Sequence, residues 1–166
     1  MADGPLLGAS VELEIGAAAH GGSCVARHDG RAVFVRHVLP GERVRALVTE
    51  DRGGGYCFAD AVEVLVASPD RVEPPCPYAG PNRCGGCDWQ HASGPAQRAI
   101  KADVIREQFR RVAHLDVGDV FDTVEELPGG LLGWRTRNVY AVGRDGVPGL
   151  RRHRSHAIEQ IGRAHV

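Results

Sequence analysis

The sequence is short of lysine. Lys101 is the only lysine among 20 lysine and arginine residues, so arginine supplies almost all of the positive charge. Arginine binds phosphate through paired hydrogen bonds, whereas lysine acts as a point charge. The formal net charge is −1, which excludes a chain that attracts nucleic acid by its overall charge alone. Any contact with phosphate must therefore come from a local cluster of arginines.

Long apolar runs and a secretory signal are also missing. No stretch approaches the roughly 18 apolar residues that span a membrane. The first ten residues, MADGPLLGAS, have no basic segment followed by an apolar one. We therefore expect a cytoplasmic protein that has no membrane partner. We also expect the protein to be a monomer.

Residues 11–67 have the pattern of short strands joined by tight turns. Apolar and polar residues alternate in VELEI and RVRALVTE, as in strands with one buried face. Asp29 and Gly30 predict a type I′ hairpin turn, and Pro40 and Gly41 in LPGE predict a type II turn. Five such strands in under 60 residues predict a small, closed, OB-like β-barrel. We expect this barrel to fold independently of any metal.

The barrel segment contains two isolated cysteines and three aromatic residues. Cys24 and Cys57 are expected to be small buried core residues. Phe34, Tyr56 and Phe58 are expected mainly in the core, and stacking on nucleic-acid bases is the alternative. No base contact is assigned to them.

The composition changes after the barrel. SPDRVEPPCPYAGPNRCGGC is rich in proline and glycine and predicts a loop. Ser93 is a good helix cap and Pro95 suits a first turn, so we predict a helix that ends near Ala113. Its expected apolar face carries Ile100, Val104, Phe109 and Val112.

The remaining sequence predicts strands and completes a mostly β chain with some α. Residues 120–126 are expected to form a strand, and the segment WRTRNVYAVGRDGVPGLRRHRSHAIE is expected to form a hairpin with RDG in its turn. The predicted organisation is a barrel (1–68), a cysteine-rich loop (69–92), a partial α+β central domain (93–159) and a tail (160–166).

Three cysteines lie close together in the loop, and no cysteine follows Cys87. Cys76, Cys84 and Cys87 form a tight cluster, which in a reducing compartment indicates a metal site. Gly85 and Gly86 are expected to allow left-handed angles in the C-x-x-C turn and to bring backbone amides close to sulfur. The spacing alone leaves both zinc and an iron–sulfur cluster open.

The motifs in combination resemble a known family. CPYAGPNRCGGCDWQH follows a barrel that carries HGG, DG, VFV and LPGE, and it precedes WRTR and GLRRHRSH. Together they resemble the class I RNA (uracil-C5)-methyltransferases with an N-terminal TRAM domain, from about residue 10 to residue 159. The resemblance implies an RNA partner, rRNA or tRNA, and a [4Fe-4S] cluster on Cys76, Cys84, Cys87 and one distant cysteine.

The resemblance also implies chemistry for which the chain shows no residues. In the family a cysteine adds to C6 of uracil, and S-adenosylmethionine then supplies the methyl group to C5. The cofactor binds an α/β domain with a glycine-rich first turn, and no such unit is recognisable here. We therefore expect an inactive N-terminal fragment without catalytic or S-adenosylmethionine-binding residues. The tail IGRAHV is expected to be non-native, with the fourth cysteine lost beyond it.

A cluster of basic residues near the end of the chain is the candidate RNA contact. In the family this region contacts RNA, and alternate residues such as Arg135 and Arg137 share one face if they lie in a strand. A face of arginines suits phosphate contacts, and an ordinary solvated face is the alternative. The predicted RNA-binding residues are Arg135, Arg137, Arg151, Arg152, Arg154 and His156.

Two other functions compete with this interpretation. A self-contained nucleic-acid-binding module could hold zinc on the three cysteines and on His91 or another histidine. A radical methylthiotransferase also combines a TRAM domain with a cluster, but its cysteines run C-x3-C-x2-C and its TRAM domain is C-terminal, unlike this sequence. Iron and sulfide analysis separates the zinc module from the methyltransferase interpretation.

Overall fold

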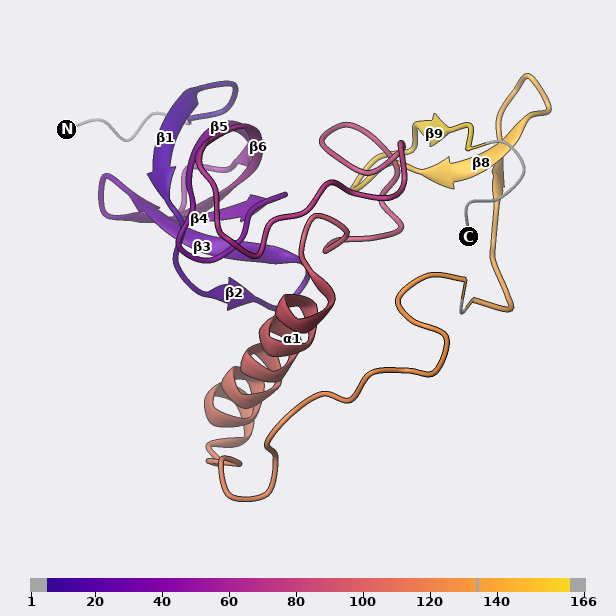
Figure 1. Ribbon diagram of the computed structural model, residues 1–166. Helices are drawn as coiled ribbons and strands as arrows, with labels where there is room; N and C mark the ends of the chain where they lie inside the picture. The colour runs from indigo at the N-terminus through magenta and orange to yellow at the C-terminus, as the bar shows by residue number, and fades with distance from the viewer. Residues whose placement is uncertain (1–5, 134, 162–166) are drawn as a thin grey trace.

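The computed structural model describes residues 6–133 and 135–161. A strongly coiled sheet is followed by a loop, a helix and a small second sheet (Figure 1). The first sheet contains β1 (Ser10–Glu14), β2 (Ala18–Ala19), β3 (Ser23–His28), β4 (Arg31–Arg36), β5 (Arg43–Asp51) and β6 (Tyr56–Val66). The later elements are α1 (Gly94–Gln108), the π-helical turn η1 (Phe109–Ala113), β7 (Ala141–Val142), β8 (Pro148–Arg151) and β9 (Ile158–Glu159).

The first sheet has the order β1-β5-β6-β4-β3-β2, with β4 and β6 parallel and the other pairs antiparallel. The mostly β fold is confirmed, but the prediction of a closed five-stranded barrel is wrong for the described residues. The short strand β2 adds a sixth strand, and no ladder joins β1 to β2. The linker between β1 and β2 also bonds to β3, from Gly16 N to Val25 O and from Val25 N to Ala17 O. The sheet curls into a barrel that stays open between β1 and β2, and we call this open structure the barrel.

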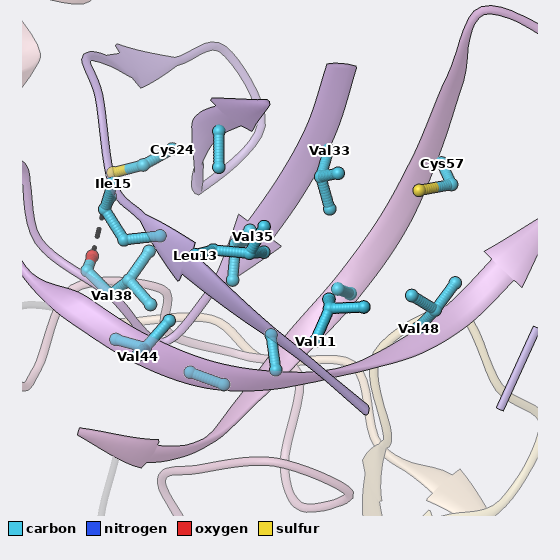
Figure 2. Close-up of a cluster of buried hydrophobic side chains, with 14 residues drawn as sticks. Val11, Leu13, Ile15, Cys24, Val33, Val35, Val38, Val44, Val48 and Cys57 are labelled. Carbon is cyan, nitrogen blue, oxygen red and sulfur yellow. Dashed lines mark hydrogen bonds between the residues drawn. The ribbon is translucent and has the colours of Figure 1, made fainter. Parts of the chain in front are cut away.

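Alternation along the strands builds the core inside this sheet. Val33 and Val35 on β4 are fully buried, as is Val44 on β5 (Figure 2). Cys24 and Cys57 also lie in this core, as predicted, with 0% and 1% of their surfaces exposed. Burial raises the pKa of Cys24 to about 12, so this thiol is a neutral core group.

The predicted turns are confirmed. Asp29 and Gly30 have φ angles of 47° and 80°, as the hairpin between β3 and β4 requires. Gly41 has a φ of 83°, and Glu42 N donates a hydrogen bond to Leu39 O across the LPGE turn. These turns fix the register that places the residues discussed below.

The helix begins where it was predicted to begin. The Ser93 hydroxyl accepts a hydrogen bond from Ala96 N, and Pro95 occupies the first turn of α1. Ile100 packs against the barrel and is 7% exposed. The predicted apolar face does not continue, however, because Phe109 and Val112 are 45% and 73% exposed.

The segment after the helix differs from its prediction. Residues 120–126 form no strand, and most of them are exposed in a coil that leads back towards the second sheet (Figure 1). The predicted hairpin is present, because β7 pairs with β8 around the RDG turn, and β9 adds a third strand. The expected tail lies mostly outside the described residues, since the structure describes it only to Ile161. In the described part of the chain, no helix is both long and apolar enough to cross a membrane.

Candidate functional site

A buried ion pair fastens the cysteine-rich loop to the barrel. The Glu42 side chain is 0% exposed and accepts hydrogen bonds from Arg71 Nε and Nη2, both at 2.6 Å. It also accepts the backbone N–H groups of Leu39 and Ser68. Burial alone would raise the pKa of Glu42, but these hydrogen bonds together hold it below its ordinary value. The start of the loop is therefore fixed to the LPGE turn.

Two further contacts hold the other end of the loop. His91 is buried, and its Nε2 lies 3.1 Å from the carbonyl oxygen of Val38. Arg36 Nη2 donates to Asp88 Oδ1 at 2.6 Å, next to the last cysteine of the loop. Among the described residues, His91 does not join the cysteines in a group that could hold a metal ion, so this structure does not support the zinc alternative.

The three clustered cysteines line one pocket, which we call the cysteine pocket. Cys76, Cys84 and Cys87 are free and share this pocket with side chains from the later segments. Those partners are Gln90, Leu131, Leu132, Arg135, Leu150 and Ile161. Within the part of the chain that the structure describes, no three His, Cys, Asp or Glu side chains are close enough to hold one metal ion. The thiols therefore face a common, largely apolar space without being drawn together.

Polar contacts order the turn around these thiols. Gly86 N donates to Cys84 Sγ at 3.4 Å, which confirms the expected approach of a backbone amide to sulfur. Cys76 N donates to Gln90 Oε1 at 3.2 Å. Burial raises the pKa of the Cys84 thiol, and the Gly86 amide opposes that change.

The left-handed angles predicted for the two glycines of the C-x-x-C turn are absent. Neither Gly85 nor Gly86 has a positive φ. Gly85 is required because a Cβ there would lie 2.8 Å from His153 N and 2.9 Å from His153 Cα. Its N–H also donates to Arg151 O. The turn is therefore packed directly against the backbone at the end of β8.

Replacing Gly85 with alanine is expected to push the C-x-x-C turn away from β8. The new methyl group would meet backbone atoms, which cannot turn aside as a side-chain tip can. The thiols of the cysteine pocket should then react several-fold faster with a disulfide reagent such as Ellman's reagent. Gly54→Ala is the control, because its Cβ would meet nothing within 4 Å. Equal thiol reaction rates in the two variants would contradict this packing.

The six predicted RNA-binding residues do not form one stripe. Arg135 and Arg137 lie in coil, so the strand assumed for them is wrong, and Arg135 donates to Gly86 O beside the cysteine pocket. Arg152 is half-buried and bonds to Glu159 Oε2, joining β8 to β9. The exposed members of the set are Arg135, Arg137, Arg151, Arg154 and His156, and Arg151 Nη1 lies 3.3 Å from His156 Nδ1.

The sequence prediction missed a group of aromatic side chains on the outer surface of the sheet. Phe34 and Phe58 are directly paired across β4 and β6, and Tyr56 precedes Phe58 by two residues on the same face. Tyr56 is 54% exposed, so the expectation that these rings lie mainly in the core is wrong. The alternation itself carried the signal, because Val33, Val35 and Cys57 already fill the inner face. We call Phe34, Tyr56 and Phe58 the aromatic face.

Comparison with known proteins agrees with this architecture. Residues 6–62 match the TRAM domain family, and they include β1 to β5 and most of β6. An uncharacterized RNA methyltransferase of Streptomyces avermitilis is 56% identical over 165 residues, which cover 93% of this chain and 38% of that protein. One from Streptomyces coelicolor is 53% identical over 94% of this chain and 36% of its own length.

A third relative has a more specific name. The 23S rRNA (uracil(1939)-C(5))-methyltransferase RlmD of Methylococcus capsulatus is 38% identical over 133 residues, which are 80% of this chain and 29% of that protein. The chain thus spans little more than a third of the length of the two Streptomyces relatives. Residues 6–62 thus match the TRAM domain family, and the chain is similar to RNA methyltransferases along almost its whole length.

Proposed function

We propose that this chain is the RNA-binding and cluster-binding N-terminal part of an RNA uracil-C5 methyltransferase that uses S-adenosylmethionine. The observation that carries the proposal is the TRAM match over residues 6–62 in a chain that resembles RNA methyltransferases over 93% of its length. The uracil-C5 specificity is supported by the name of the Methylococcus relative. The RNA substrate is rRNA or tRNA, and none of the described residues is assigned a catalytic or S-adenosylmethionine-binding role.

The exposed arginines of the C-terminal hairpin region supply the phosphate contacts in this proposal. Arg137 and Arg151 are exposed, whereas Arg152 is tied to Glu159 and holds the small sheet together. Each arginine–phosphate contact releases counterions, so the affinity for RNA falls as the salt concentration rises.

The double variant Arg137→Ala with Arg151→Ala should bind single-stranded RNA several-fold more weakly than the unchanged chain. If both guanidinium groups contact phosphates, the slope of log affinity against log salt should also become shallower by about 1 to 2. Titrations of fluorescent RNA at several salt concentrations measure both quantities. Arg110→Ala removes another exposed arginine, on η1, and is the control. If the double variant kept the affinity and salt slope of this control, the hairpin would not be the contact surface.

The cysteine pocket is the proposed cluster site. Its donor set is three thiols, which suit an iron–sulfur cluster, and its leucine and isoleucine lining would shield a cluster from water. Cys76, Cys84 and Cys87 would hold a [4Fe-4S] cluster, and they would have to draw closer together to do so. The cluster, when bound, supplies iron–thiolate bonds that cross-link the loop. Gln90 Oε1 accepts the backbone N–H of Cys76, and the Gly86 N–H donates to the sulfur of Cys84.

A further inference from the structure

The aromatic face forms a compact set of rings. The Phe34 and Phe58 ring centroids are 5.5 Å apart, and Tyr56 meets both rings edge-on at 5.9 and 5.7 Å. These contacts fix the orientation of Tyr56 while leaving more than half of its surface exposed. Three adjacent rings outside the core form an apolar patch on the surface, and such patches mark sites where another molecule binds.

A groove of about 680 Å³ runs beside these rings. Its lining includes the aromatic face, Arg36 from β4, and His153 and Arg154 from the turn after β8. Two parts of the chain that are about 100 residues apart thus build one concave surface. This size is typical of sites that enclose a small organic group.

Arg154 is held over the rings in a defined position. Its guanidinium carbon lies 3.9 Å from the centroid of the Phe58 ring, and its Nη1 donates to Glu50 Oε2 at 3.1 Å. Its backbone has a φ of 48°, a left-handed value that is uncommon for arginine. A cation stacked on an aromatic ring beside an open tyrosine provides a flat surface for a base and a positive charge for its phosphate.

We propose that this groove binds an unpaired base of single-stranded RNA, stacked on Tyr56 and flanked by Phe34 and Phe58. This inference rests on the proposed RNA-binding function and identifies the class of RNA that the TRAM domain takes. In a duplex the flat faces of the bases are covered by their neighbours, whereas an unpaired base presents its face to an aromatic ring. The Arg154 guanidinium reaches the adjoining phosphate, and the rigid ring cluster provides the stacking surface.

The test compares two tyrosine variants of the 166-residue chain. Tyr56→Leu removes a ring from the groove, and Tyr140→Leu removes a ring that is 40% exposed elsewhere. Fluorescence anisotropy with a labelled single-stranded RNA of about twelve nucleotides measures the affinity, and the same RNA annealed to its complement serves as the duplex probe. Phe58→Leu is the second groove variant, and it keeps an apolar side chain against the sheet.

The expected result is a loss of about tenfold in affinity for single-stranded RNA in Tyr56→Leu, because stacking contributes strongly to each bound base. The salt slope should stay unchanged, since no charge is removed. Tyr140→Leu should bind like the unchanged chain, and the duplex should lose little affinity in any variant.

Three results would overturn the inference, and they differ in what they say about the proposed function. Normal single-strand binding by both groove variants would exclude base stacking in the groove and leave RNA binding itself in place. Equal losses for single-stranded and duplex RNA would show that the rings do not select unpaired bases. A chain that bound neither RNA would overturn this inference together with the proposed function.

Discussion

Replacing Arg71 with alanine is expected to lower the free energy of unfolding of the chain by about 3 kcal/mol. The substitution leaves the Glu42 carboxylate, whose side chain is 0% exposed, without the guanidinium that donates two hydrogen bonds to it. A buried charge that loses its partner keeps the cost of having left water and loses the compensating attraction. Urea denaturation followed by tryptophan fluorescence measures the change.

Arg45→Ala is the matched control for this prediction. Arg45 also pairs with carboxylates, on Glu12 and Glu63, but all three side chains are at least 41% exposed. Exposed ion pairs contribute little because water screens them, so this variant should unfold almost like the unchanged chain. Equal stability losses for Arg71→Ala and Arg45→Ala would contradict the role of the buried pair.

The pH dependence provides a second readout of the same pair. The pKa of Glu42 is lower in the folded protein than its ordinary value of 4.5. The carboxylate therefore contributes stability above its unfolded pKa, and that contribution is lost as the pH falls through the folded pKa. Arg71→Ala removes the main hydrogen-bonding cause of the lowered pKa, so its stability should depend less on pH in the acidic range. If the free energy of unfolding changed with pH in the same way in the unchanged chain and in Arg71→Ala, the hydrogen bonds from Arg71 would not be the cause of the lowered Glu42 pKa.

Replacing Cys84 with serine is expected to abolish most of the iron that the reconstituted chain retains. Cys84 lies between the other two cysteines of the cysteine pocket in the sequence, and the Gly86 N–H donates to its sulfur. A serine hydroxyl is a poor substitute for a thiolate ligand of iron. The measurement is iron and sulfide per chain after anaerobic reconstitution, together with the broad visible absorbance of the cluster.

Cys57→Ala is the control for the iron measurement, because Cys57 is buried in the barrel core, away from the cysteine pocket. This variant should retain as much iron and sulfide as the unchanged chain. If Cys84→Ser retained as much iron as the unchanged chain, Cys84 would not be a ligand of the cluster. Stable zinc without sulfide in the unchanged chain would instead favour the zinc-binding module.

Local sequence rules predicted the turns and the helix start correctly. Asp29 and Gly30 sit at positive φ, and Ser93 caps α1, because these features depend on residues that are neighbours in the chain. The burial of Cys24 and Cys57 followed from the strand alternation around them. The strand expected at residues 120–126 failed because a strand needs a pairing partner, and the local sequence does not reveal whether one is present.

The candidate site was less predictable, because its contacts join distant parts of the chain. Glu42 was recognised only as part of a turn, yet its main partner lies 29 residues later. Arg135, which was predicted to contact RNA, also bonds to Gly86, which is 49 residues earlier, and the local sequence did not indicate that contact. The predicted barrel ends at residue 68 and therefore lacks Arg71, the main partner of the buried Glu42. No local sequence pattern indicates this contact, which the predicted independent folding of the barrel did not take into account.

The most direct test of the central claim is the binding of single-stranded RNA by the unchanged chain as the salt concentration is raised from about 50 to about 200 mM. A TRAM-containing part of an RNA methyltransferase should bind RNA at the low concentration and lose affinity steadily, with a linear fall of log affinity against log salt. No binding at the lowest salt concentration, or an affinity that does not change with salt, would contradict the account.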